Sequence, residues 1–248
     1  MLKKNIAILL IAGAAAGCTE SGQRTAGYTA YQTAVKEPSD LCYNHARTAL
    51  LTVSDNTARV YEISFEGKTL RTLPFNGKDH ADGGDLEGIT TNPQTKEIYV
   101  CSEANNTIFK LDSSGNFLNV VAQINVPNAV VNSGLEGIAY GRDTLYLVNE
   151  KRPCLLVKYA LSTGTQSRIP LSFASDLSGI SYDFTDHTLW IISDESKAIY
   201  HTDLNGKVLY TQHHDIEQGE GIVVNREEKF YYAVCDKTGK LYKIEISE

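Results

Sequence analysis

The chain has 248 residues, of which 42% are apolar, 21% are charged and 9% are aromatic. This composition excludes a disordered chain, a collagen and a coiled coil, and the length allows a single domain with a sizeable core. The formal net charge is −7. A nucleic-acid partner is therefore disfavoured, because a surface that binds phosphates needs an excess of Lys and Arg. Cationic partners are favoured instead.

The N-terminus has the pattern of an export signal. Lys3 and Lys4 precede an apolar run over residues 6–16, which is too short for a membrane span of about 20 residues. The small residues before Cys18 resemble the lipobox of bacterial lipoproteins, in which that cysteine becomes the acylated first residue. We therefore predict a lipoprotein signal peptide over residues 1–17, a lipid-anchored tether over 18–27 and one folded domain over 28–248. The membrane would be a partner through lipidated Cys18, and the protein would lie in the bacterial cell envelope, at the outer membrane or the periplasmic face. The alternative is a plain signal peptide with a chance cysteine.

Four further cysteines lie in or beside apolar runs, at Cys42, Cys101, Cys154 and Cys235. They form no CxxC pair and have no His at ligand spacing, so a zinc site has little support. An oxidising envelope permits a disulfide, but free buried thiols are the favoured interpretation.

A short phrase recurs along the chain and decides the predicted architecture. Its spacings are 49, 42 and 42 residues, and a degenerate copy, Pro38-Ser39-Asp40-Leu41, precedes the other four. The four clear copies are Asp85-Leu86-Glu87-Gly88-Ile89, Gly134-Leu135-Glu136-Gly137-Ile138, Asp176-Leu177-Ser178-Gly179-Ile180 and Gln218-Gly219-Glu220-Gly221-Ile222. Five repeats therefore fill the mature chain.

Each repeat reads as four short strands. An apolar run follows the phrase, a third run alternates apolar and polar residues, and in four repeats a glycine turn such as Ser114-Gly115 leads into the next run. Four antiparallel strands in every repeat describe the blade of a β-propeller, which usually has four to eight blades. We predict an all-β, five-bladed β-propeller, with a β-sandwich as the alternative. The last blade lacks one strand, and the segment Tyr28 to Val35 is predicted to supply it and close the ring.

The repeat also places two sets of polar side chains. The phrase opens the innermost strand, and the acid that follows the second run closes the neighbouring antiparallel strand, so both sets are expected on one face, around the mouth of the central channel. The inner ring would comprise Ser39, Glu87, Glu136, Ser178 and Glu220. The second ring would comprise Asp55, Glu103, Glu150, Asp194 and Asp236.

So many carboxylates repel one another when they are partly desolvated, so either their pKa values are raised or a cation is bound. Oxygen-only ligands favour Ca²⁺. We predict that Glu87, Glu136 and Glu220 contact one central Ca²⁺, with waters or Ser39 and Ser178 completing its shell. Two interpretations are open for the second ring: the favoured one is that its acids accept hydrogen bonds from backbone amides between blades, and the other is that they supply further metal ligands or line the face. In the favoured interpretation the repeated glycine would serve the close packing of the inner strands.

At these residues the chain resembles a known family. The phrases around Glu87, Glu136 and Glu220, and Leu177-Ser178-Gly179-Ile180-Ser181-Tyr182 with Leu189-Trp190-Ile191-Ile192-Ser193-Asp194-Glu195, look like those of the SdiA-regulated, YjiK-like family. The resemblance covers roughly residues 36–248. It implies a five-bladed propeller distantly similar to NHL repeats, carried by envelope proteins and holding calcium.

Two functions remain open at this point. The first is a noncatalytic, calcium-binding envelope lipoprotein whose acidic face binds an unknown small molecule, glycan or protein. The second is a calcium-dependent hydrolase, a phosphoesterase or lactonase, with the metal at the channel mouth. A phosphatase would need cations beside the metal, and the candidates are Lys151, Arg152, Lys197 and Lys237; a lactonase would need a base such as His80. His213 and His214 are better explained as a surface doublet. Neither GxSxG nor a Gly-rich phosphate loop occurs, so no catalytic residue is assigned.

Overall fold

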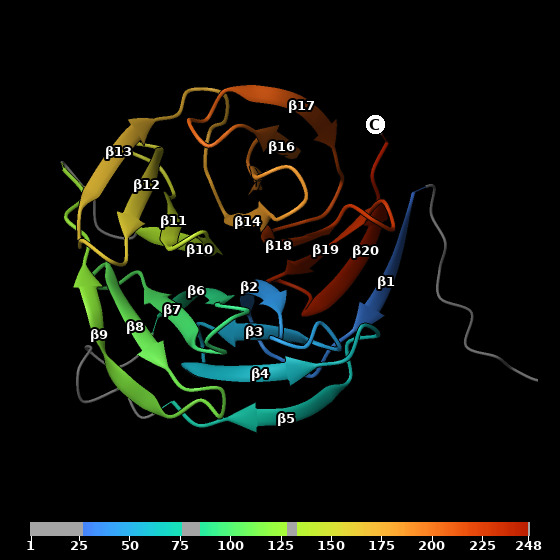
Figure 1. The fold of residues 1–248 in the computed structure, drawn as a ribbon. Helices are drawn as coiled ribbons and strands as arrows, with labels where there is room; N and C mark the ends of the chain where they lie inside the picture. Colours follow the sequence, from blue (N-terminus) through green and yellow to red (C-terminus); the bar gives the residue numbers. More distant parts are fainter. Residues whose placement is uncertain (1–26, 76–84, 128–132, 248) are drawn as a thin grey trace, which may run out of the picture.

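The computed structural model describes residues 27–75, 85–127 and 133–247. Over these residues every regular element is a β-strand, and the strands form five antiparallel sheets of four strands each. The sheets are arranged as blades around a common axis (Figure 1). The prediction of an all-β, five-bladed propeller is confirmed, and the sandwich alternative is wrong. Within the described part of the chain, no helix is long and apolar enough to cross a bilayer. Residues 1–26, with Cys18, lie outside it.

The blades follow one another along the chain, and each runs from its innermost to its outermost strand. The first blade has β2 (Pro38–Tyr43), β3 (Leu50–Ser54), β4 (Arg59–Ile63) and β5 (Thr69–Leu73). The second has β6 (Leu86–Thr91), β7 (Ile98–Ser102), β8 (Thr107–Leu111) and β9 (Phe117–Gln123). The third has β10 (Leu135–Gly141), β11 (Thr144–Asn149), β12 (Leu155–Ala160) and β13 (Gln166–Pro170). The fourth has β14 (Gly179–Asp183), β15 (Thr188–Ser193), β16 (Ala198–Thr202) and β17 (Val208–His213). The fifth has β18 (Gly219–Asn225), β19 (Phe230–Cys235), β20 (Lys240–Glu245) and β1 (Tyr28–Gln32).

The N-terminal strand closes the ring, as predicted. β1 pairs antiparallel with β20, from Tyr28 opposite Ile244 to Gln32 opposite Lys240. The strand is shorter than the predicted segment, but the backbone N–H of Thr33 still donates to the carbonyl of Gly239 at 3.0 Å. The first and last strands of the domain therefore share one sheet, which covers the edge that β20 would otherwise expose.

Burial explains why the inner strands are continuous apolar runs. β3 and β7 are buried along their whole length because neighbouring blades cover both of their faces. The outermost strands β5 and β9 are mostly exposed. Trp190, in β15, is fully buried and its ring stacks on His201 at 4.4 Å between centroids, so it belongs to the core, as expected. Among the described residues the four cysteines are free, as expected; Cys42, Cys101 and Cys235 are also buried, as predicted, whereas Cys154 is only partly buried.

The inner strands β2, β6, β10, β14 and β18 contact one another in that order around the axis, and β18 contacts β2. The repeated glycine permits this close approach because it has no Cβ atom. A Cβ atom on Gly137 would lie 2.9 Å from the Cα of Gly179, and one on Gly221 would lie 2.5 Å from the Cα of Asp40. We call this layer the waist; its members are Asp40, Gly88, Gly137, Gly179 and Gly221. The structure thus supports a packing role for the glycines.

Candidate metal centre at one end of the channel

The inner glutamates stand at irregularities of the sheet. The pairing register of β6 with β7 shifts between Leu86 and Gly88, and that of β10 with β11 shifts between Leu135 and Gly137. The residue between each pair is Glu87 or Glu136. A bulge leaves an extra residue without a ladder partner and turns its side chain, so it directs each glutamate toward the axis instead of into a neighbouring blade.

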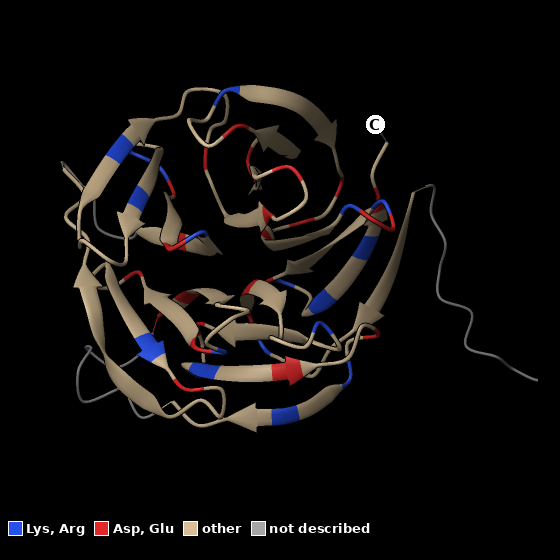
Figure 2. Ribbon diagram, in the orientation of Figure 1, with Lys and Arg blue, Asp and Glu red and all other residues tan. Residues whose placement is uncertain are grey.

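A cavity of about 500 Å³ opens at this end of the channel. It is lined by nine of the ten predicted site residues: Ser39, Asp55, Glu87, Glu136, Glu150, Ser178, Asp194, Glu220 and Asp236. Five further residues complete the lining: Glu37, Lys151, Asp176, Glu195 and Gln218. We call this cavity the acidic mouth. In Figure 2, acidic residues mark the strands and loops around the axis, whereas many Lys and Arg residues lie on outer strands.

Two triplets of carboxylates are close enough to share an ion. One is Asp55, Asp85 and Glu87, and the other is Glu103, Glu136 and Glu150; within each triplet the candidate ligand atoms lie within 4.8 Å of one another. Glu220 belongs to neither triplet of the described residues. The structure therefore brings the three inner glutamates to one cavity but groups two of them with acids of the second ring.

The acids of the second ring have different partners. Glu103 accepts the backbone N–H of Gly134 at 2.9 Å, and Asp194 accepts that of Gly219 at 3.1 Å. Both bonds join one blade to the next, which is the amide-binding interpretation favoured above. Glu150 instead forms an ion pair with Lys151 at 2.5 Å. Asp236 has no side-chain hydrogen-bond partner in the part of the chain that the structure describes.

The fourth blade holds its side of the mouth with a hydrogen-bond network. Asp176 accepts the hydroxyl of Ser178 at 3.2 Å, the backbone N–H of Glu195 at 3.0 Å and the hydroxyl of Ser193. Ser178 is therefore engaged by a neighbour. Asp176 was not selected from the sequence, although the recurring phrase contains it two residues before Ser178, as it contains Asp85 two residues before Glu87.

Burial and mutual repulsion raise the pKa values of the inner glutamates. Burial, followed by the charge of Asp55, raises the pKa of Glu87 to about 9. Burial, followed by Asp194 and Asp236, raises the pKa of Glu220 to about 8. Burial and the nearby Glu87 raise the pKa of Glu136 well above its ordinary value. Without a cation, Glu87 and Glu220 are mostly protonated near neutral pH, and a bound cation would displace their protons.

Three of the four candidate cations at this end are already paired, and the fourth, Arg152, is exposed and does not line the acidic mouth. Lys151 contacts both Glu150 and Glu195, and Lys197 donates to Asp194 at 2.5 Å and to the carbonyl of Ile216 at 3.0 Å. Lys237 forms an ion pair with Glu217, which does not line the acidic mouth.

None of the described histidines lines the acidic mouth. His213 is exposed, and burial lowers the pKa of His214 to about 4. His80 lies outside the described residues.

A buried acid at the waist was missed by sequence reasoning. Asp40 is fully buried, and its carboxylate accepts the backbone N–H groups of Leu41 at 2.8 Å and Ile89 at 3.0 Å. The backbone N–H groups of Ile138 and Ile222 also interact with it. Burial raises the pKa of Asp40 well above its ordinary value, and these amides partly offset that effect. The one available signal was that Asp40 replaces the repeated glycine.

These features define a class of protein: a five-bladed β-propeller whose inner strands approach closely at the waist and whose cavity at one end is lined mainly by acids. A sequence model of the SdiA-regulated family matches residues 25–236. The chain belongs to the SdiA-regulated family.

Proposed function

We propose that the protein is a calcium-binding envelope lipoprotein that uses the acidic mouth, through its bound ion, to hold a ligand or partner, and that it is not an enzyme. The observation that carries the proposal is the pair of carboxylate triplets at the acidic mouth, each with two of its three members in the lining of the cavity. Every candidate ligand atom there is an oxygen, and Ca²⁺ takes six to eight oxygens in irregular geometry.

The carboxylates fit such an ion by their chemistry and by their spacing. The ion would be held on one side of the mouth by Asp55, Asp85 and Glu87. Alternatively, it would be held on the adjacent side by Glu103, Glu136 and Glu150. One oxygen of Glu103 accepts an amide hydrogen, which leaves the other for the metal. Glu220, which lines the same cavity, would add negative charge or a further ligand.

The surroundings of the mouth favour binding over hydrolysis. A phosphoesterase needs an unpaired cation beside the metal to hold the phosphate, but Lys151 and Lys197 are in ion pairs with mouth acids. A lactonase needs a general base near the metal, and no described histidine lines the cavity. These features support a site that holds a ligand without transforming it.

Attachment to the envelope is part of the proposal. The apolar run over residues 6–16, followed by Cys18, supports export and acylation. Cys18 precedes Tyr28, where the closing strand β1 begins, by ten residues, so a short tether would keep the propeller near the bilayer.

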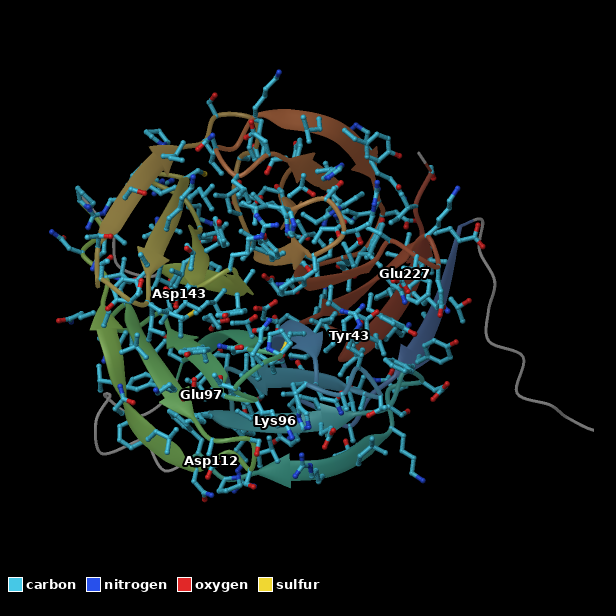
Figure 3. All side chains as sticks on the ribbon, viewed as in Figure 1. Tyr43, Lys96, Glu97, Asp112, Asp143 and Glu227 are labelled. Carbon is cyan, nitrogen blue, oxygen red and sulfur yellow. The ribbon has the colours of Figure 1, made fainter. Side chains whose placement is uncertain are left out.

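Calorimetry with Ca²⁺ tests the metal site directly. The protein should bind Ca²⁺ saturably, and Glu136→Gln should weaken binding at least tenfold, because it removes a central carboxylate. Glu227→Gln is the matched control: Glu227 is exposed in the turn between β18 and β19 (Figure 3) and does not line the acidic mouth. The absence of Ca²⁺ binding, or equal binding by both variants, would refute the metal site.

A substrate screen tests the noncatalytic part. The protein is incubated with generic phosphoester and lactone substrates, with and without EDTA. We expect calcium-dependent thermal stability and no turnover. Turnover that EDTA abolishes would establish the hydrolase in its place.

A further inference from the structure

A second cavity, of about 250 Å³, lies at the opposite end of the channel. On each inner strand the residue before the waist lines the acidic mouth, while residues after the waist line this cavity. In β10, for example, Glu136 lines the acidic mouth and Ile138 lines the second cavity, with Gly137 between them. We call this second cavity the second mouth.

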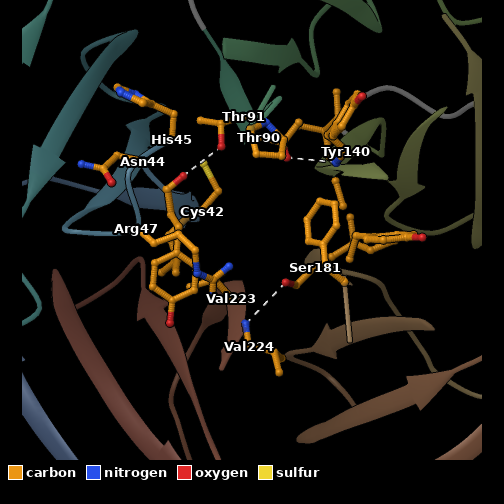
Figure 4. A pocket seen from close by; sticks show the side chains of 18 residues that line it. Cys42, Asn44, His45, Arg47, Thr90, Thr91, Tyr140, Ser181, Val223 and Val224 are labelled. Carbon is orange, nitrogen blue, oxygen red and sulfur yellow. Dashed lines mark hydrogen bonds between the residues drawn. The ribbon is translucent and has the colours of Figure 1, made fainter. Parts of the chain in front are cut away.

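Small side chains create the space. The second residue after the waist is small in every blade and lines the second mouth in every blade: Cys42, Thr90, Ala139, Ser181 and Val223. In Figure 4, labelled residues from all five inner strands surround an open centre. Because five equivalent positions form this ring, the cavity is a product of the repeat and not a local packing defect.

Aromatic rings form the wall outside these small residues. Tyr43, Tyr140 and Tyr182 stand one residue further along their strands and line the cavity. Phe184 lies at the rim, where it is 44% exposed and packs edge-on against Tyr182 at 4.9 Å between centroids. Aromatic walls of this kind favour a flat apolar ligand, which stacks or packs edge-on against them.

Two hydroxyl groups of the second mouth, those of Thr90 and Ser181, have a hydrogen left to donate. Thr90 accepts the backbone N–H of Tyr140 at 3.0 Å, and Ser181 accepts that of Val224 at 3.4 Å. Each of these hydroxyl groups keeps its hydrogen for an acceptor in the cavity.

The lining of the second mouth differs in charge from that of the acidic mouth. Arg47 is exposed, lies over the Tyr43 ring at 4.2 Å and has no ion pair with the described residues. No Asp or Glu lines the second mouth in the part of the chain that the structure describes.

We propose that the second mouth binds a small aromatic carboxylate. The ring enters the space between the five small side chains and the tyrosines, the carboxylate pairs with Arg47 at the rim, and Thr90 and Ser181 donate to a polar atom on the ring. Arginine suits this task because its planar guanidinium stacks on an aromatic ring and still presents N–H groups to a carboxylate. The site is separate from the proposed calcium site, since the waist divides the two cavities.

Calorimetry with three probes of the same shape tests the charge assignment. The probes are 1-naphthoate, the neutral 1-naphthamide and the cationic 1-naphthylmethylamine. We expect 1-naphthoate to bind most tightly and the amine least. Equal affinities for the three probes, or no saturable binding of any, would overturn the proposal.

Variants assign the binding to this cavity. Arg47→Gln should weaken 1-naphthoate about tenfold and leave 1-naphthamide unchanged, because only the carboxylate uses the guanidinium. Arg59→Gln is the matched control, an exposed arginine at the start of β4 that lines neither mouth. Phe184→Ala should weaken both probes several-fold. Glu136→Gln should change neither; a loss of 1-naphthoate binding in that variant, or an unchanged affinity in Arg47→Gln, would place the ligand elsewhere and refute the site.

Discussion

The two ends of the channel are built from the same strands and have opposite character. At the acidic mouth, residues before the waist carry carboxylates whose burial is costly without a counter-charge. At the second mouth, three to four residues further along each strand, small and aromatic side chains leave an apolar space with an arginine at its rim. Because the propeller repeats each strand position five times, one change of residue type per repeat alters a whole layer of the channel.

The waist makes this difference possible. Gly88, Gly137, Gly179 and Gly221 let the inner strands approach backbone to backbone, and Asp40 fills the remaining space with a carboxyl group that accepts amide hydrogens. The two cavities are thereby kept apart, although in β10 only one residue, Gly137, lies between a residue that lines one cavity and a residue that lines the other.

The largest effect is expected from the acid at the waist. Asp40→Ala leaves the buried N–H groups of Leu41 and Ile89 without an acceptor, which should lower the free energy of unfolding by about 2–5 kcal/mol. Denaturant titration of the calcium-free protein measures this loss in the free energy of unfolding. Ser39→Ala, one residue earlier, is the control and should cost under about 1 kcal/mol. Equal losses in the two variants would mean that the carboxyl of Asp40 does not hold the waist.

A methyl group at the waist should have the next largest effect. In Gly179→Ala the new Cβ would overlap the carbonyl oxygen of Glu220, a backbone atom that cannot move freely. A loss of about 1–3 kcal/mol is expected, as for overpacked cores. In Gly219→Ala the Cβ would meet the flexible end of Ile192 at 3.1 Å, so that variant should lose less. Thermal unfolding of the two variants measures the difference. If Gly219→Ala were the less stable variant, the close approach of the inner strands would be contradicted.

A pH titration tests the buried acids of the acidic mouth, which have no counterpart among the described residues that line the second mouth. The ordinary pKa of Glu220 is near 4.5 and its folded-state pKa is about 8, so the folded protein binds more protons between these values than the unfolded chain does. Stability contributed by the protonated form is complete below pH 4.5 and is lost as pH rises toward 8. The calcium-free protein should therefore melt at a lower temperature at pH 8 than at pH 5.5, and saturating Ca²⁺ should remove most of this difference, because the ion favours the ionised acids. A melting temperature that rises with pH in the absence of calcium would contradict the burial of these acids.

Much of the fold was predictable because it follows from repetition. The spacing of the Glu87, Glu136 and Glu220 phrases indicates the number of blades, and the missing last strand indicates that Tyr28 begins the closing one. The gathering of acids at one end follows from the antiparallel order of the first two strands in each blade. These inferences need only chain order and the alternation of side chains.

The remaining features depend on contacts between blades, which a single repeat does not contain. Whether Glu103 binds an amide or an ion depends on the position of Gly134 in the next blade. The role of Asp40 depends on amides from other blades that converge on the axis. The second mouth arises from small residues such as Ala139 and Ser181, which look unremarkable one at a time and form a cavity only as a ring.

The smallest expected effect distinguishes two acids within the acidic mouth. Glu103 accepts an amide hydrogen from the next blade, whereas Asp236 has no such partner among the described residues, and burial followed by the charge of Glu37 raises its pKa. Without calcium, Glu103→Ala should lose about 1 kcal/mol of stability, the typical net value of one hydrogen bond. Asp236→Ala should lose nothing or gain slightly, because it relieves repulsion. With calcium the ranking depends on which acid also binds the ion, so both variants are unfolded with denaturant in EDTA. An equal loss in the two would show that the second ring acts as one set, and that the hydrogen bond to Gly134 contributes nothing measurable.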